Sequence, residues 1–163
     1  MAPPDSEHSE SESTATDLRL EVVVIPVSDV DKAKDFYVDT LGFRADADYP
    51  INDGYRIVQV TPPGSACSVI FGEGLTTAPA GSAQGLHLIV TDIEQAVGEL
   101  TARGVDVDGP FHDATGAFHH AGRADRVLGL QPERASYGSF ASFADPDGNE
   151  WFLQEVTERA PGR

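Results

Sequence analysis

The sequence predicts an α+β fold of two βαβββ modules, and two observations lead to this prediction. The first is a repeat, because the pattern of Val22–Phe43 returns in Gly85–Val105, about 63 residues later. Each copy combines an apolar strand, a polar pair ending in Asp, and a helix-like apolar stripe that ends at glycine. The second observation is that strand-like segments follow each copy. Such a period indicates two copies of one supersecondary unit.

The first module begins with an apolar strand at about Leu18–Val27. From Val22 onward both faces of this strand are apolar, which predicts that it is covered on both sides. Ser28 or Asp29 is expected to cap the following helix, and Gly42 to end it. Three further strands are predicted at Phe43–Tyr49, Tyr55–Thr61 and Cys67–Phe71.

The second module repeats this order from the strand Leu86–Val90. Residues 91–94, T-D-I-E, fit a capping box, and Gly104 ends the helix. The strands that follow are predicted at Val105–Phe111, Tyr137–Phe143 and Glu150–Val156. The last two are joined by the strong turn D-P-D-G-N at 145–149. A long irregular segment, His112–Ser136, interrupts the module.

These elements predict one domain with short tails. Residues 1–17 are acidic and almost free of large apolar groups, so they cannot offset their ordering entropy and are expected to be disordered. The domain is expected to span 18–157, with module one at 18–75 and module two at 84–157. Residues 158–163 form a C-terminal tail.

Composition excludes several classes of function. With 11 basic and 27 acidic residues, the formal charge is −16, which argues against nucleic acid as a partner. No apolar segment has the length of a membrane span, and the N-terminus lacks the pattern of a signal peptide. The single cysteine, Cys67, excludes an intramolecular disulfide. We therefore expect a cytoplasmic protein without membrane or nucleic-acid partners.

Three motifs give the sequence a family resemblance. They lie at Pro26–Phe43, Val90–Ile93 and Phe143–Asn149. With them, residues 18–156 resemble the vicinal oxygen chelate superfamily, which groups glyoxalase I, bleomycin-resistance proteins and extradiol dioxygenases. The resemblance implies two modules whose sheets curl around a cleft for a small molecule. In the metal-dependent members, that cleft holds a divalent ion bound by the first and last strand of each module.

The metal positions implied by the resemblance are occupied by poor ligands. In the first strands they fall on Val22 and Gly85, and in the last strands on Ser68 and Phe152. Valine, glycine and phenylalanine side chains have no lone pair for a metal. We therefore predict no metal ligands at the usual site and no cofactor, while a divalent metal bound in another way stays open.

Two residues further along, the same faces of these strands carry Val24, Ile70, His87 and Gln154. Together with the four previous positions, they are expected to line the cleft. His87 is the side chain there whose ordinary pKa suits proton transfer near neutrality, so it is the candidate catalytic residue. A hydrogen-bonded histidine of the core is the alternative.

The long segment His112–Ser136 is predicted to be a lid over the cleft, because structureless loops of this length are usually functional or disordered. His119 and Arg123 are its expected contacts to a ligand. A solvated flexible loop is the alternative. A metal bound by His112, Asp113, His119 and His120 also stays open.

Three functions remain at this point. One is a glyoxalase or bleomycin-resistance-like protein that binds a small molecule in the cleft between the modules, without the usual metal. Another is a metal-dependent lyase, isomerase or dioxygenase with an atypical site. The third is a regulatory or structural protein without chemistry. Unpaired sheet edges make a homodimer possible.

Overall fold

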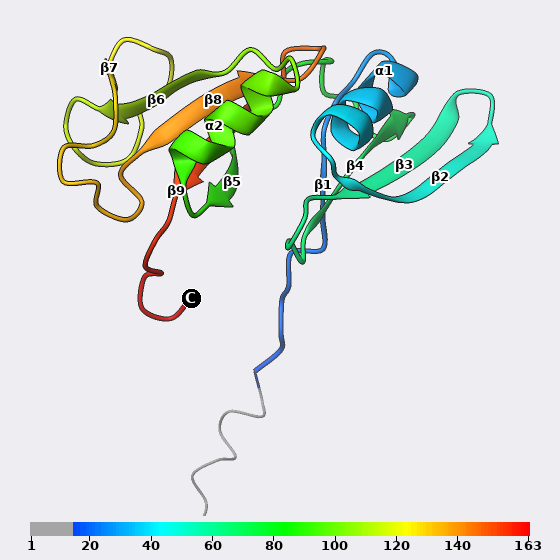
Figure 1. Ribbon diagram of the computed structural model, residues 1–163. Helices are drawn as coiled ribbons and strands as arrows, with labels where there is room; N and C mark the ends of the chain where they lie inside the picture. The colour runs from blue at the N-terminus through cyan, green and yellow to red at the C-terminus, as the bar shows by residue number, and fades with distance from the viewer. Residues whose placement is uncertain (1–14) are drawn as a thin grey trace, which may run out of the picture.

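The computed structural model describes residues 15–163, which form two mixed sheets, each crossed on one face by a helix (Figure 1). Sheet one has the strand order β1-β4-β3-β2, and sheet two has the order β5-β9-β8-β6-β7. The strands are β1 (Val22–Val24), β2 (Arg44–Asn52), β3 (Tyr55–Thr61), β4 (Ser68–Glu73), β5 (Leu86–Val90), β6 (Asp108–Asp113), β7 (Arg126–Leu128), β8 (Phe140–Ala144) and β9 (Glu150–Glu155). In each sheet the first strand of the module runs parallel to the last. This confirms the predicted α+β fold of two modules.

Both helices are capped by an aspartate. Asp29 is one of the two predicted caps of the first helix, whereas the capping box predicted Thr91 for the second and Asp92 takes that place. Asp29 accepts the backbone N–H of Lys32 at 3.1 Å at the start of α1 (Val30–Lys34). Asp92 accepts the N–H of Gln95 at 3.1 Å at the start of α2 (Ile93–Ala102). In both caps the carboxylate satisfies an N–H that has no partner within the helix. The first helix continues as a π-helix, η2 (Asp35–Thr40).

The helix-facing sides of the two sheets share one hydrophobic core. Tyr37 of η2 lies at its centre, fully buried, with its ring 5.8 Å from the Trp151 ring of β9. The Tyr37 hydroxyl donates to Asp145 at 2.7 Å and accepts from the Trp151 indole N–H at 2.9 Å. The two modules are therefore joined on the helix side, and each sheet keeps one face directed away from this core. We call that face, opposite the helix, the distal face.

The turn at 145–149 strengthens this junction. Asp147 accepts the backbone N–H and the hydroxyl of Ser28 at 3.0 and 2.5 Å. The Asn149 amide donates to the carbonyl of Pro26 at 2.8 Å. The backbone N–H of Gly81 donates to the same carbonyl at 3.0 Å, and a Cβ there would lie 2.1 Å from the carbonyl oxygen of Asp147. The turn residues thus hold the two modules and the segment between them together.

Two expectations about the chain need correction. The first strand is shorter than predicted, since residues 18–21 extend away from the body (Figure 1) and Leu18 and Leu20 are exposed. It is also not covered on both sides, because the Val24 side chain on the distal face is 37% exposed. The acidic tail lies mostly outside the described residues.

The long segment of module two is only partly irregular. It contains β7, which pairs with β6 and adds a fifth strand to sheet two. Between β6 and β8 runs the segment 114–139, which we call the lid loop. Over residues 15–163, no helix combines the length and the apolar character needed to cross a membrane.

Candidate functional site

Aromatic side chains gather on the distal face of sheet two. Strand register places His87 beside Phe152, Phe140 opposite Gln154, and Phe111 opposite Phe140. Because directly paired residues point to the same face of a sheet, these side chains lie together. Phe111, Phe140 and Phe152 form a buried cluster separate from the main core. We call these three residues the aromatic cluster.

The tip of the lid loop, Phe118–His119, covers this cluster. The His119 ring stacks on the Phe152 ring with centroids 3.9 Å apart and an angle of 16° between the planes. The Phe118 ring meets Phe140 edge-on at 5.6 Å. His119 Nε2 also lies 2.9 Å from His87 Nε2. The structure thus brings three predicted site residues together: His87, His119 and Phe152.

His87 is half-buried among these rings. Burial lowers the pKa of His87 from its ordinary value of 6.5, and His119 lowers it further. His87 is therefore neutral near pH 7. In that form one ring nitrogen donates a hydrogen bond and the other accepts one, so His87 suits a polar contact to a ligand or the uptake of a proton.

Arg126 of β7 completes the polar side of the site. Its side chain is only 10% exposed, and its guanidinium carbon lies 4.2 Å from the Phe111 ring centroid and 5.6 Å from that of Phe152. Nη1 donates to Asp108 at 2.5 Å and to the Ser142 hydroxyl at 2.8 Å. Among the described residues 15–163 its buried Nε–H has no hydrogen-bond partner, which is unusual for a charged group.

The sequence pointed to a different arginine. Arg123 was the expected ligand contact, but its side chain is 69% exposed and donates to Asp108 at 3.1 Å. Arg126 was missed as a site residue because its position depends on the pairing of the three-residue strand β7 with β6. Phe111 and Phe140 could have been found, since they lie in predicted strands of the same module.

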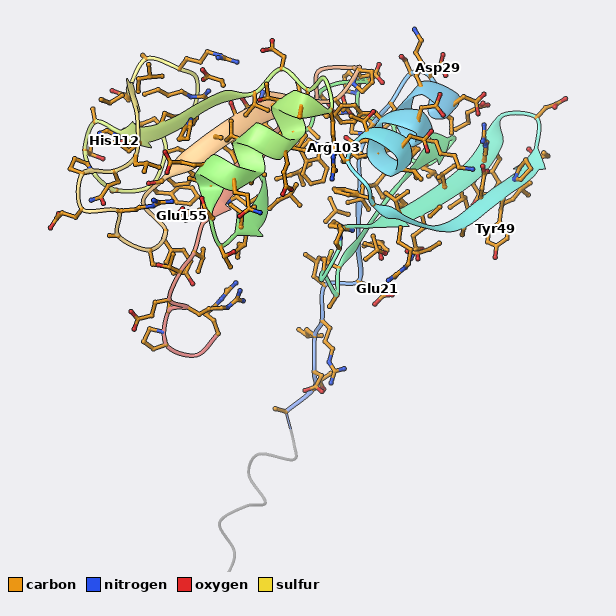
Figure 2. All side chains as sticks on the ribbon, viewed as in Figure 1. Glu21, Asp29, Tyr49, Arg103, His112 and Glu155 are labelled. Carbon is orange, nitrogen blue, oxygen red and sulfur yellow. The ribbon has the colours of Figure 1, made fainter. Side chains whose placement is uncertain are left out.

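The two ends of the lid loop are held by buried carboxylates. At its start, buried Asp113 accepts hydrogen bonds from Thr115 and, at 2.6 Å, from His120 Nδ1. The bonds from Thr115 and then His120 hold the pKa of Asp113 well below its usual range, and Asp113 raises the pKa of His120. Near the other end, Arg134 donates to buried Glu155 at 2.8 and 3.0 Å. Figure 2 shows Glu155 at the end of sheet two nearest the C-terminal segment.

The remaining predicted residues of module two have structural roles. Gly85 precedes β5 at φ 79°, a left-handed conformation that favours glycine, so it offers no side chain to the site. Gln154 is buried, and its amide donates to the carbonyl of Tyr137 at 3.0 Å, which fixes the end of the lid loop.

The predicted residues of module one lie on the distal face of sheet one. Val22 pairs with Ser68 and Val24 with Ile70. His87 corresponds to Val24 in the repeat and pairs with Phe152, so the counterpart of Phe152 is Ile70 rather than Ser68. The structure does not bring this set next to the residues of module two.

The groove between the modules has a different lining. It holds about 690 Å³ and runs between β5, α2 and the turn at 62–66. Of the ten predicted site residues, only His87 lines it. Arg103 of α2 stands at this junction (Figure 2) and donates to the carbonyl of Leu41 at 3.3 Å. The residues of the site therefore converge on the distal face of sheet two, outside most of this groove.

The donor set does not fit a divalent metal. The four positions implied for ligands carry no imidazole or carboxylate. Two residues further along β5, His87 offers an imidazole, and its Nε2 lies 2.9 Å from Nε2 of another histidine, His119. His112 is engaged with the carbonyl of Gly129 at 2.9 Å, away from His120 and its partner Asp113. Within residues 15–163, no three His, Cys, Asp or Glu side chains are placed to hold a metal.

Comparison with known proteins identifies the family. Residues 19–153 match the Glyoxalase/Bleomycin resistance protein/Dioxygenase superfamily. The chain belongs to this superfamily. The match covers both modules, and it confirms the resemblance inferred from the three motifs.

Several known proteins are similar to this chain in sequence or in structure. TnmS3, an antibiotic binding protein from Streptomyces sp. CB03234, is 34% identical, with a TM-score of 0.66 over 87% of this chain and 98% of its own. A glyoxalase/bleomycin resistance protein from the same strain is 36% identical, with a TM-score of 0.62 over 84% and 100%. The uncharacterized protein YetH of Bacillus subtilis is 26% identical over 141 residues, which is 84% of this chain and 98% of YetH.

Proposed function

We propose that the protein binds a small molecule on the distal face of sheet two and needs no divalent metal to do so. The observation that carries the proposal is the stacking of His119 on Phe152 beside neutral His87. Binding sites for small molecules combine an apolar pocket with a few convergent polar groups. The aromatic cluster supplies an apolar surface under the loop tip, and His87 and Arg126 supply polar groups beside it.

The relatives support a small-molecule ligand. TnmS3 is an antibiotic binding protein and shares both modules with this chain. We therefore propose antibiotics as the first compounds to test. The acidic charge of −16 supports the absence of a nucleic-acid partner. A cytoplasmic location and a homodimer remain predictions.

A second candidate is an enzyme in which His87 takes up a proton. The lowered pKa of His87 favours it, since a neutral imidazole near pH 7 can act as a general base. His119 lies 2.9 Å away and could receive that proton. Consumption of a bound compound by the wild-type protein, abolished by His87→Gln with binding retained, would establish this candidate over simple binding.

Thermal-shift measurements on chelator-treated protein test the proposal. A panel of small antibiotics is titrated into the wild type and into Phe152→Ala and His87→Ala. Tyr49→Ala, on the exposed distal face of sheet one, serves as the aromatic control. We expect stabilisation of the wild type and the control by the same compound, and at least about a tenfold weaker affinity for the two site variants. Stabilisation that appears only after a divalent ion is added contradicts the proposal.

A further inference from the structure

We infer that the loop tip Phe118–His119 occupies the position of a flat aromatic ligand with an oxygen at its edge, and that this ligand displaces the tip when it binds. The inference rests on the proposed function and deepens it, because it names the ligand chemistry and a competition within the chain.

The contact of His119 resembles that of a bound ligand more than core packing. Its ring lies nearly parallel to Phe152 at 3.9 Å, and Phe140 meets it edge-on at 5.3 Å. Flat rings gain from both arrangements. Yet His119 belongs to a loop and is only half-buried, while the Phe118 side chain is 53% exposed. A flat ligand that uses the same surfaces would bury aromatic area that the tip leaves in water.

The tip can leave while the rest of the loop stays in place. Thr115 and Arg134 lie outside the tip and donate to Asp113 and Glu155, so the two ends of the loop stay held when the tip moves. The hydrogen bond between His120 and Asp113 lies in the moving part and is lost when the tip leaves. Gly116 and Gly122 flank the tip, both at positive φ (82° and 73°) and with open space around the Cα atom. Because glycine changes its backbone angles at little steric cost, these positions suit hinges.

The polar atoms around the cluster define the edge of the ligand. In the structure, His87 Nε2 contacts the ring of His119, so departure of His119 leaves this nitrogen free for a ligand. The Arg126 side chain lies over two rings of the cluster, and its Nε–H has no partner in the part of the chain that the structure describes. A buried donor without an acceptor is costly, and a ligand oxygen would satisfy it. The matching ligand is therefore a planar ring system that carries a carbonyl or phenolic oxygen.

Binding of 2-naphthol, a flat bicyclic ring with a phenolic oxygen, tests this inference on the full chain. Decahydro-2-naphthol has the same carbon skeleton and hydroxyl without aromaticity, so it serves as the matched ligand. We compare the wild type, the double variant Phe118→Ala/His119→Ala and the control Leu128→Ala, an exposed residue of the same segment. Calorimetry gives the affinities, and ¹H–¹⁵N spectra give the place of binding.

We expect the double variant to bind 2-naphthol at least about fivefold more tightly than the wild type, since the binding-competent state is no longer in competition with the tip. Leu128→Ala should bind 2-naphthol with the affinity of the wild type. The affinity for decahydro-2-naphthol should be the same in the double variant as in the wild type. In the wild type, 2-naphthol should shift the His119 ring protons toward their values in an unstructured chain.

Other results overturn the inference and separate it from the proposed function. Equal affinities of the wild type and the double variant, with unmoved His119 signals, refute the competition, while the observed binding keeps the proposed function. If neither protein binds 2-naphthol, the inferred ligand chemistry is wrong. The antibiotic panel then decides separately whether the proposed function stands.

Discussion

At the scale of single residues, two histidines near the lid loop have opposite environments. Burial and His119 lower the pKa of His87, and Asp113 raises the pKa of His120. Above pH 6.5, the pKa of histidine in the unfolded chain, neutral His87 contributes fully to the free energy of unfolding. This contribution is lost as pH falls through the lower pKa that His87 has in the folded protein. Charged His120 contributes fully to the free energy of unfolding below pH 6.5. This contribution is lost as pH rises through the higher pKa that His120 has in the folded protein.

An NMR titration of the histidine ring protons tests this contrast. We expect a midpoint below 6.5 for His87 and above 6.5 for His120. His120→Ala removes one partner of Asp113, so the acidic loss of the stability that Asp113 contributes should be smaller in this variant and should end at a higher pH. Equal midpoints for the two histidines would contradict the described contacts of the loop.

Tyr37 makes a buried polar contact between the modules. Tyr37→Phe keeps the ring but removes the hydroxyl between buried Asp145 and Trp151. We expect a loss of about 1–3 kcal/mol in the free energy of unfolding, since two buried partners each lose a hydrogen bond. Urea denaturation measures the loss, and Tyr49→Phe at an exposed position is the control. An unchanged midpoint would show that the hydroxyl does not stabilise the junction.

At the scale of elements, the lid loop depends on its anchors. Arg134→Ala leaves Glu155 buried without its charged partner. Because the Arg134 side chain is 41% exposed, we expect a loss in the free energy of unfolding that is smaller than for a fully buried pair. Hydrogen exchange should rise in residues 130–139 and at the start of α2, where Glu155 also accepts the N–H of Ile93 at 2.9 Å.

Arg123→Ala is the matched control for this prediction. Arg123 belongs to the same loop, but its partner Asp108 also pairs with Arg126. A side chain as exposed as that of Arg123 contributes little to stability. If both variants lose equal stability, Arg134 has no special role in holding the loop.

The elements also show what the sequence could and could not predict. The cap at Asp29 follows from local capping chemistry, which the chain itself encodes, whereas the capping-box pattern placed the second cap one residue before Asp92. The strand β7 could not be predicted, because three residues form a strand only through their pairing with β6. The strand positions of His87 and Phe152 could therefore be predicted, but the place of Arg126 beside Phe152 could not.

At the scale of the whole molecule, the repeat predicted the two modules but not their arrangement. Their placement depends on contacts between residues over a hundred positions apart, such as Tyr37 with Asp145 and Trp151. These contacts join the helix sides, so the distal faces point away from the shared core. A pattern of local periodicity carries no information about such contacts.

The distal face of sheet one bears on the predicted homodimer. Val24, Tyr49 and Tyr55 of this sheet are large apolar residues left exposed, and β1 and β2 are its edge strands. Exposed apolar faces and open edges favour association with a second copy. We expect light scattering to give twice the chain mass of 17.3 kDa, and Val24→Asp to shift the protein toward the monomer. A wild-type monomer at high concentration would refute this prediction.

Chemical-shift mapping on chelator-treated protein shows whether sheet two binds a flat small molecule without metal. On titration with 2-naphthol, we expect saturable changes confined to the strands of sheet two and residues 118–119, with no effect of added divalent ions. Changes confined to sheet one, or binding that requires a divalent ion, would contradict it.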